Sequence, residues 1–347
     1  MAAGTGPGRR RAGLSTHKSS FSWDRHRRLL ALLVVVGFLL SGMSGVVAYF
    51  LPALAAAFQT TGQATLGKGG KSTRPTANPT STPTPASGAS FTVLLLGSDN
   101  DSKFEPGQVL TQTMILARVD PSTHQAVMLS IPRDLWVPIA SGGSAKIDAA
   151  YLDGGAADAV QTVENNFDVP VNYWVWIGLG GLVSLVNQLH GVNIVGQMPI
   201  LDEQYPADLT GSNPYDNQRI AILPGPQRVN GVNALTYVRS RHGDILEDIG
   251  RSQKQQQLLV DIKAAASTLG IADIPRIAGS LGNEIRTSMS LTEVGSIAAL
   301  AKDFSDGNVQ QIVMLPPDFT SGIIDSQDAL APNWSAINAL VAKNFPT

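Results

Sequence analysis

The chain has 347 residues, no cysteine and a formal net charge of −2 at pH 7. The charge is divided unevenly: residues 1–90 hold ten of the 25 Lys and Arg but one of the 27 Asp and Glu, which leaves 15 cations and 26 acids in residues 91–347. An acidic part of this size argues against nucleic acid as a partner, because binding to DNA or RNA depends on neutralising phosphates. The lack of cysteine excludes disulfides and thiol catalysis.

The N-terminal residues have the pattern of a membrane anchor. Residues 1–28 are basic and polar, and the run from Leu29 to Phe50 is apolar or small throughout, without a charge. At a rise of about 1.5 Å per residue, this run can cross a hydrocarbon core of about 30 Å. We predict a transmembrane helix over residues 29–51 of the cell membrane. The cations before it predict a cytoplasmic tail over residues 1–28 and an extracytoplasmic location for the rest.

A cleaved signal peptide is the alternative interpretation, because Ala53-Leu-Ala55 resembles a small-residue cleavage site. The apolar run is longer than the apolar region of about 7–15 residues in a signal peptide, which favours a retained anchor. Residues 59–90 that follow are rich in Pro, Thr, Ser and Gly, a composition that cannot bury a core. They predict a semi-extended linker, and an O-glycosylated stalk is a second possibility.

From residue 91 on, the sequence predicts one large α/β domain. Apolar or β-branched runs bounded by turn residues indicate strands, and longer amphipathic or apolar segments indicate helices. Alternating strands and helices predict a sheet with helices on both faces. The expected strands are Phe91–Gly97, Thr113–Val119, Ala126–Ile131, Val171–Ile177, Val192–Val195 and Gln310–Leu315, the second and third forming a hairpin. The expected helices are Gly155–Phe167, Leu182–Leu189, Gly231–Val238, Arg251–Leu269, Leu291–Phe304 and Trp334–Ala342, with an exposed loop over Asp202–Asn217.

A cationic segment between Tyr237 and Gln257 has the residue types of a phosphate site. Arg239 and Arg241 are two positions apart, so they share a face if the backbone there is extended. Arg251 and Gln255 are four apart, so they share a face if a helix begins near Gly250. Arginine's planar fork matches phosphate oxygens, and the segment therefore predicts a phosphate or pyrophosphate pocket. A solvated charged segment with an internal salt bridge is the alternative.

Four motifs in order resemble the LytR-CpsA-Psr family of cell-envelope glycopolymer phosphotransferases. They are Leu94-Leu-Leu-Gly-Ser-Asp99, Ser130-Ile-Pro-Arg-Asp134, Lys146-Ile-Asp-Ala-Ala-Tyr151, and Tyr237-Val-Arg-x-Arg followed by Asp248-x-Gly-Arg-x-x-Lys-Gln-Gln. The resemblance covers about residues 91–263 and implies an α/β/α sandwich with a mixed sheet over residues 91–347. It implies transfer of glycan phosphate from a polyprenyl-pyrophosphate glycolipid to a cell-wall glycan acceptor. It also implies an apolar cavity for the polyprenyl chain, which the helix Leu182–Leu189 could line.

The resemblance also assigns roles to single residues. Asp99 directly follows a predicted strand, where open α/β sheets place ligands, and a carboxylate there can hold Mg²⁺. A turn aspartate that caps its own backbone is the alternative. Asp248 is expected to orient Arg251 or to act as a base. The implied set is Arg133, Arg239, Arg241 and Asp248 as catalytic residues, Lys146, Arg251 and Gln255 as substrate-binding residues, and Asp99 as the Mg²⁺ ligand.

The sequence departs from the resembled family before the second strand. The family reads Arg-x-Asp-Thr there, whereas this chain has Leu110-Thr-Gln112-Thr113. A neutral amide at Gln112 replaces a second metal carboxylate, and Leu110 replaces an arginine. The change at Gln112 favours one alternative to the transferase, a weak or inactive protein that binds the lipid pyrophosphate or acts as a scaffold. A lipid-pyrophosphate hydrolase that uses water as acceptor is a further alternative, which an acceptor-dependence assay separates from the transferase.

Overall fold

The structure is a computed structural model that describes residues 88–98, 109–207, 213, 215–240, 247–267 and 269–346. The side chains of residues 153, 247–249, 271, 275, 291 and 306 are outside this description. All described residues belong to one of the two compact units into which the chain divides, Phe50–Thr347. The predicted tail and transmembrane helix, and the linker up to residue 87, lie outside the described residues. None of the described helices combines the length and the apolar composition that a membrane span requires.

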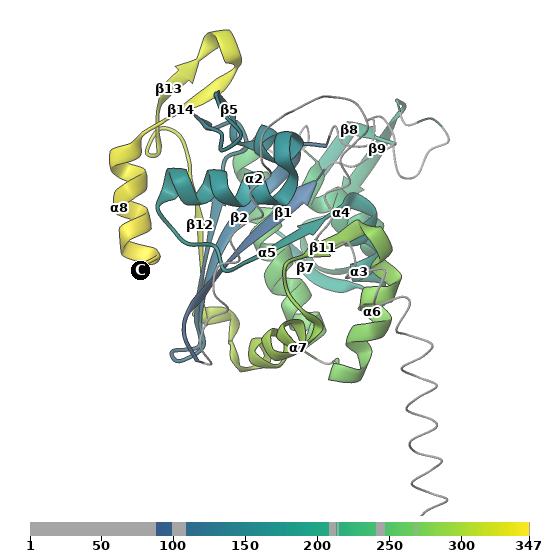
Figure 1. The fold of residues 1–347 in the computed structure, drawn as a ribbon. Coiled ribbons are helices and arrows are strands. Elements are labelled where there is room, and N and C mark those ends of the chain that lie inside the picture. The colour runs from purple at the N-terminus through teal and green to yellow at the C-terminus, as the bar shows by residue number, and fades with distance from the viewer. Residues whose placement is uncertain are drawn as a thin grey trace, which may run out of the picture. The chain divides into compact units, whose positions relative to one another are not determined.

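A six-stranded mixed sheet forms the centre of the fold (Figure 1). Its strand order is β11-β6-β1-β2-β3-β12. Strand β1 pairs antiparallel with β2 and parallel with β6, β2 with β3 and β6 with β11 are antiparallel, and β3 with β12 is parallel. The strands are β1 (Phe91–Ser98), β2 (Thr111–Asp120), β3 (Gln125–Ile131), β6 (Tyr173–Ile177), β11 (Ile285–Thr287) and β12 (Val309–Val313). The predicted hairpin and mixed α/β class are confirmed.

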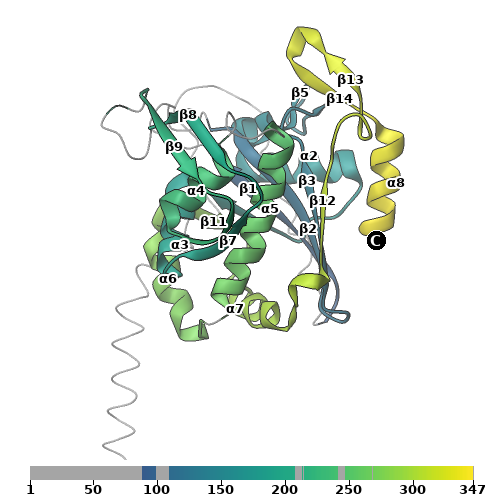
Figure 2. The ribbon, with the colours of Figure 1, turned by 180° about the vertical axis from the view of Figure 1, so that it is seen from behind.

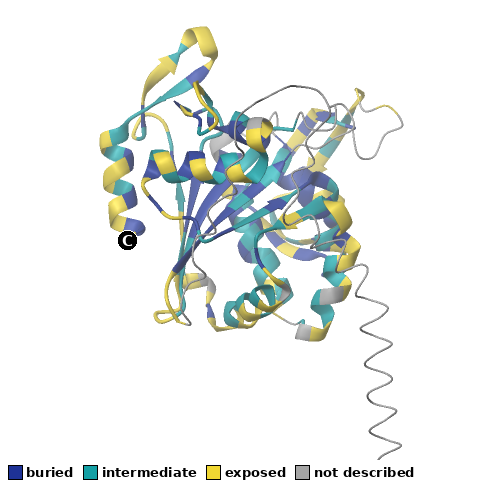
Figure 3. Ribbon diagram, viewed as in Figure 1, coloured by how far each residue is buried: buried dark blue, intermediate teal, exposed yellow. Residues whose placement is uncertain are grey.

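Strand β1 is apolar without alternation because both faces of the sheet are covered. Leu94 and Leu96 pack with α2 (Ala150–Phe167) and α8 (Trp334–Asn344) in the largest core cluster. Leu95 belongs to the opposite face, where α5 (Glu247–Ala266) packs. Figures 1 and 2 show α2 and α5 on opposite faces, and Figure 3 shows the strands between them as mostly buried.

Helix α5 is fastened to the sheet by a polar side chain as well as by apolar contacts. Val260 packs against Ile115 of β2 and Met128 of β3. Gln256 is fully buried, and its Nε2 donates to Ser130 Oγ at 2.7 Å and to the Ile312 carbonyl at 2.8 Å. Because buried amides are costly unless hydrogen-bonded, these two bonds fix the middle of α5 against β3 and β12.

Helix α2 starts earlier than the sequence prediction of Gly155. It begins at Ala150 and contains a kink at Gly154 and Gly155, where Gly155 has a φ of +66°. Only glycine adopts such a φ readily, so the kink explains why the regular helical pattern becomes visible only after it.

The remaining helices and four two-stranded sheets, β4-β5, β7-β10, β8-β9 and β13-β14, lie around the central sheet. They are β4 (Trp136–Pro138), β5 (Ser144–Lys146), α3 (Leu179–Gln188), β7 (Val192–Gly196), β8 (Ile200–Pro206), β9 (Asn217–Ile222), β10 (Gly225–Val229), α4 (Gly231–Arg239), α6 (Ile274–Leu281), α7 (Leu291–Leu300), β13 (Thr320–Ile324) and β14 (Ala329–Pro332). The predicted exposed loop over Asp202–Asn217 is wrong at both ends, because β8 and β9 form an antiparallel pair. Ile200, Asp202 and Tyr205 of β8 are buried, which a solvated loop would not allow.

Candidate active site

A cavity of about 410 Å³ lies between the sheet and the helices α3, α4 and α5. Its walls are mostly apolar. Leu182 and Leu185 of α3 line it, as predicted for the helix over Leu182–Leu189. The other apolar lining residues include Leu95, Ile115, Val175 and Ile177 from the sheet and Leu235, Leu258, Leu259 and Ile262 from α4 and α5. A cavity of this kind suits an apolar chain.

Two arginines and three glutamines line the same cavity. They are Arg239 and Arg251 with Gln112, Gln204 and Gln255. Arg251 is 8% exposed, and Gln255 lies one turn further along α5. The prediction that these two residues share a helix face is confirmed by their common cavity. Cations beside an apolar chamber match a ligand that joins a phosphate to an apolar chain.

Arg239 reaches the cavity from the last residue of α4. Its guanidinium carbon lies 5.9 Å from the centre of the Tyr205 ring, a cation–π geometry that orients the side chain. The extended backbone assumed for Arg239 and Arg241 is absent at Arg239, which is helical, and the chain leaves the helix at Ser240 with φ −60° and ψ 133°. Arg241 lies outside the described residues.

Strand β8 supplies cavity residues that the sequence prediction placed in a loop. Asp202, Gln204 and Tyr205 all line the cavity. Asp202 is 1% exposed, and its carboxylate accepts from Ser240 Oγ at 2.8 Å and from the Gln204 backbone N–H at 2.9 Å. These bonds fix the end of α4, and with it the position of Arg239. The spacing of Ile220 and Ile222 in β9 was the available signal for a strand pair.

Arg133 lies behind Gln112 instead of lining the cavity. Its Nη1 donates to Gln112 Oε1, and its Nε lies 3.3 Å from Asp134 Oδ2. Gln112 lines the cavity, so the amide lies between the Arg133 guanidinium and the chamber. Leu110, the other residue that departs from the family pattern, accepts a hydrogen bond at its carbonyl from Ser98 Oγ at 2.9 Å.

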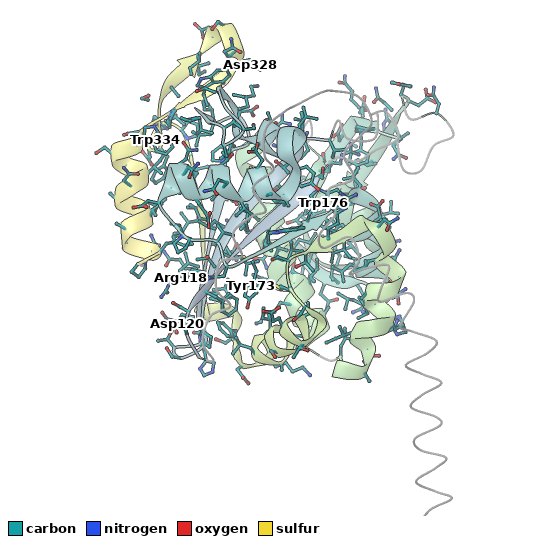
Figure 4. All side chains as sticks on the ribbon, in the orientation of Figure 1. Arg118, Asp120, Tyr173, Trp176, Asp328 and Trp334 are labelled. Atoms are coloured by element: carbon teal, nitrogen blue, oxygen red, sulfur yellow. The ribbon has the colours of Figure 1, made fainter. Side chains whose placement is uncertain are left out.

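Lys146 belongs to an ion-pair cluster outside the cavity lining. Its Nζ lies 3.0 Å from Asp134 Oδ1 and 3.7 Å from Asp328 Oδ2. Asp328 is fully exposed and lies on the β13–β14 hairpin, which Figure 4 shows away from the helices around the cavity. Asp134 thus lies between the cations of Arg133 and Lys146 and offsets their charge.

Asp148 is a buried carboxyl next to this cluster. Burial raises its pKa to about 6, although the nearby cations of Arg133 and Lys146 lower it. Its backbone N–H donates to the Arg133 carbonyl at 3.2 Å, and its carbonyl accepts from Thr111 Oγ1 at 3.2 Å. The side chain therefore titrates within the range of ordinary assay buffers, close to one of the predicted phosphate ligands.

For two further predicted residues, Asp248 and Asp99, the structure describes no side chain. Asp248 lies in the first turn of α5, but its side chain is not described. Asp99 lies outside the described residues and directly follows Ser98, the last residue of β1, which lines the cavity. Among the described residues, no group of three or more His, Asp or Glu side chains comes together as a metal site.

Comparison with known proteins gives a consistent family match. A family model described as the LytR_cpsA_psr family matches residues 56–342. The chain is 30% identical over 240 residues to the polyisoprenyl-teichoic acid–peptidoglycan teichoic acid transferase TagV of Bacillus subtilis (strain 168), a match that covers 67% of this chain and 58% of TagV. The chain therefore spans less than two thirds of the length of that relative.

Solved structures share the fold. The crystal structure of Bacillus subtilis TagV superposes with a TM-score of 0.60 and 25% identity, over 74% of this chain and 98% of that chain. The structure of TagT bound to LIIa-WTA gives a TM-score of 0.59 and 25% identity, over 75% of this chain and 92% of that chain.

Proposed function

The chain belongs to the LytR_cpsA_psr family, and from this premise we propose that it transfers glycan phosphate from a polyprenyl-pyrophosphate-linked precursor to a cell-wall glycan acceptor. The observation that supports this function is the cavity itself, in which apolar walls from α3 and the sheet meet the cations Arg239 and Arg251. The apolar walls are complementary to the chain of a lipid, and the two cations are complementary to its charged head. The printed name of the similar TagV, a teichoic acid transferase, points to the same reaction class.

The proposed step is a displacement at phosphorus. The acceptor hydroxyl oxygen attacks the phosphorus that carries the glycan, and the bond from this phosphorus to the bridging oxygen breaks. The lipid phosphate leaves with the electron pair, and the hydroxyl proton passes to solvent. Such a transfer needs positioning and charge stabilisation more than covalent chemistry. Arg239 and Arg251 would stabilise the pyrophosphate charge from the cavity, and Gln255 would donate through its amide.

Arg133 would act through its position beside Gln112. Its guanidinium bridges the neutral amide of Gln112, which lines the cavity, and the carboxylate of Asp134, which offsets part of its charge. The roles of Arg241 and Asp248 rest on the motif alone: Arg241 would bind the same phosphates, and Asp248 would orient Arg251. Lys146 would contribute its field from the cluster with Asp134, at longer range.

Mg²⁺ is part of the proposal, with Asp99 as its carboxylate ligand. The support is that Asp99 follows Ser98 at the cavity wall. When bound, the ion would offset charge on the pyrophosphate. The only motif amide near this position, Gln112, already accepts a hydrogen bond from Arg133. Mg²⁺ affinity is therefore expected to be weak. The hydrogen bond between Gln112 and Arg133 also favours a second candidate function, a protein that binds the lipid pyrophosphate with low turnover.

We propose the membrane as the place of action. The uncharged run of residues 29–51 would anchor the chain, and the linker of residues 59–90 would space the domain from the bilayer on the extracytoplasmic side. A polyprenyl substrate stays in the membrane, so an anchored domain meets it at high local concentration.

The test is a transfer assay with the full chain in lipid nanodiscs, a polyprenyl-pyrophosphate glycan donor and peptidoglycan as acceptor. The expected result is acceptor-bound glycan phosphate together with polyprenyl phosphate in equal amounts. Release of glycan phosphate into water without an acceptor would identify a hydrolase. Saturable donor binding without either product would support the binding protein, and the absence of donor binding would refute the proposed function.

A further inference from the structure

A second cavity, of about 500 Å³, lies on another side of α5. Alternate positions of this helix face the two cavities. Arg251, Gln255, Leu258, Leu259 and Ile262 line the first cavity, whereas Gly250, Gln253, Lys254, Gln256 and Gln257 line the second. The second cavity is also lined by Gln197 and Met198 between β7 and β8, by Ile200 of β8 and by Tyr237 of α4. Gln311 and Val313 of β12, and Leu315 after this strand, complete the lining. We call it the glutamine pocket.

The lining of the glutamine pocket is polar but almost uncharged. Five glutamines contribute, and among the described lining residues there is no Asp or Glu. The amides of Gln197, Gln253 and Gln311 are exposed and form no hydrogen bond within the described parts of the chain. A glutamine amide both donates and accepts, so three such groups facing one cavity match a ligand that offers hydroxyl and amide groups.

Two side chains of the glutamine pocket, Lys254 and Gln256, are held in place by contacts within the protein. Lys254 is 8% exposed, its Nζ lies 5.7 Å from the centre of the Tyr237 ring, and it donates to the Ser240 carbonyl at 3.4 Å. Gln256 is held by its bonds to Ser130 and Ile312, while its Oε1 is buried without a hydrogen-bond partner. The pocket is therefore preformed, and its floor holds an unpaired acceptor of the kind that marks functional positions.

We propose that the glutamine pocket binds the acceptor, an uncharged glycan of N-acetylated amino sugars. This inference rests on the proposed function and adds the acceptor site to it. The acetamide and hydroxyl groups of such a sugar pair with neutral amides, whereas an anionic polymer would find a single, already engaged lysine. A polyol also pairs with these amides, but an acetamide group adds an N–H donor and a C=O acceptor that can pair with both groups of one glutamine amide at once.

The location of the glutamine pocket next to the first cavity also supports its assignment to the acceptor. Gly250 lines the glutamine pocket and Arg251 lines the first cavity, so adjacent residues of α5 face the two ligands. The same holds for Tyr237 and Val238 of α4. A glycan in the pocket therefore lies beside the arginine end of the chamber, where its hydroxyl has to meet the pyrophosphate.

The test compares variants at the pocket rim. Gln253→Ala combined with Gln311→Ala removes two exposed amides and leaves Gln256 in place. Gln310→Ala is the matched control, because Gln310 is the exposed neighbour of Gln311 on β12 and does not line the pocket. The full chain is titrated calorimetrically with tetra-N-acetylchitotetraose, with cellotetraose as the analogue without acetamide groups, and with a peptidoglycan stem peptide.

The expected result is saturable binding of the acetylated tetrasaccharide that is about tenfold weaker in the double variant and unchanged in the control. Cellotetraose should bind more weakly than the acetylated sugar. No saturable binding by the wild type, equal affinity in the double variant, an equal loss in the control, or a preference for the stem peptide would each overturn the proposal. Binding of the polyprenyl-pyrophosphate donor is measured on the same samples: its retention in the double variant separates failure of this inference from failure of the proposed function.

Discussion

Two groups of cations in this fold differ in their surroundings. Arg239 and Arg251 line a chamber whose walls are mostly apolar. Arg133 and Lys146 lie on either side of Asp134, within 3.3 Å and 3.0 Å of its oxygens. Charge beside apolar walls is screened less by solvent, so it interacts more strongly with a ligand phosphate than charge in the partly exposed cluster around Asp134. The cavity arginines are therefore expected to dominate donor binding although all four residues belong to family motifs.

The largest effect is expected from the cavity arginines. Arg251→Ala or Arg239→Ala should weaken donor binding by roughly 10- to 100-fold, because a charge-assisted hydrogen bond contributes about 1.5–3 kcal/mol. Arg251→Lys should recover only part of the loss, since Lys cannot bind bidentately. Calorimetric titration with the lipid pyrophosphate measures the loss of donor affinity. Arg219→Ala is the control, because Arg219 is exposed and pairs with Glu203 at 2.7 Å. Unchanged affinity in both alanine variants would contradict the comparison.

A second prediction concerns the pH dependence of stability that comes from Asp148, the buried carboxyl next to the Asp134 cluster. The folded-state pKa of Asp148, about 6, lies above its ordinary value of 3.8, so folding favours the protonated form. This group's contribution to stability is full below about pH 4 and is lost as the pH rises through 6. Asp148→Asn should remove this loss and raise the unfolding free energy at pH 7 by at most about 2–3 kcal/mol.

Urea denaturation of wild type and Asp148→Asn between pH 4 and 8 tests this prediction. The two proteins should converge near pH 4, diverge between about pH 4 and 6, and differ by a constant amount above pH 6. Asp303→Asn, at an exposed aspartate, should follow the wild type throughout. Parallel curves for wild type and Asp148→Asn would show that the carboxyl does not titrate in the folded state as its burial requires.

A third prediction concerns Gln112, the residue through which Arg133 reaches the cavity. Gln112→Asp adds a carboxylate to the cavity wall that also holds Ser98, the residue before Asp99. It should therefore lower the Mg²⁺ concentration for half-maximal transfer by severalfold, on the order of 1 kcal/mol in binding. A Mg²⁺ titration of the transfer assay measures this. Gln112→Glu, with the charge one methylene further out, is the control for geometry. Unchanged Mg²⁺ dependence in a fully active wild type would exclude a metal role for this position.

The smallest effect is expected at Lys146. Lys146→Ala should weaken donor binding by less than about fivefold, because its ammonium is already paired with Asp134 and a partly exposed pair contributes about 0–1 kcal/mol. The same calorimetric titration measures it beside Arg251→Ala. A loss at Lys146 that equals the loss at Arg251 would mean that the ammonium leaves Asp134 for the ligand, and the contrast between the two groups would disappear.

The sequence predicted most of the central sheet because its strands are long apolar runs with short turns. It also predicted that α3 lines an apolar chamber. The contact between Gln112 and Arg133 was not predicted, although it follows from the hairpin: Met114 pairs with Ile131, so the same register places position 112 opposite 133. Register, and not residue type, was the missing information.

The residues of β8 could not be predicted in the same way. Asp202 is polar, yet it is buried because Ser240, far away in the chain, donates to it. Prolines and polar residues around it favour a loop in any local interpretation. Arg239 lines the cavity, but with a helical backbone in place of the extended one that the prediction assumed, since the end of α4 depends on the same contact with Asp202. A long-range polar contact thus determines the burial of Asp202 and the end of α4, which local sequence patterns did not predict.

The hydrogen bonds of Gln256 have a mechanical consequence. One side chain fastens the middle of α5 to β3 and β12. The partition between the two cavities is therefore expected to resist sliding along the sheet when one side fills. Gly250 and Arg251, near the start of α5, are adjacent residues that line opposite cavities. With the donor and the acceptor in these two cavities, as proposed, such a partition would allow the two ligands to bind in either order.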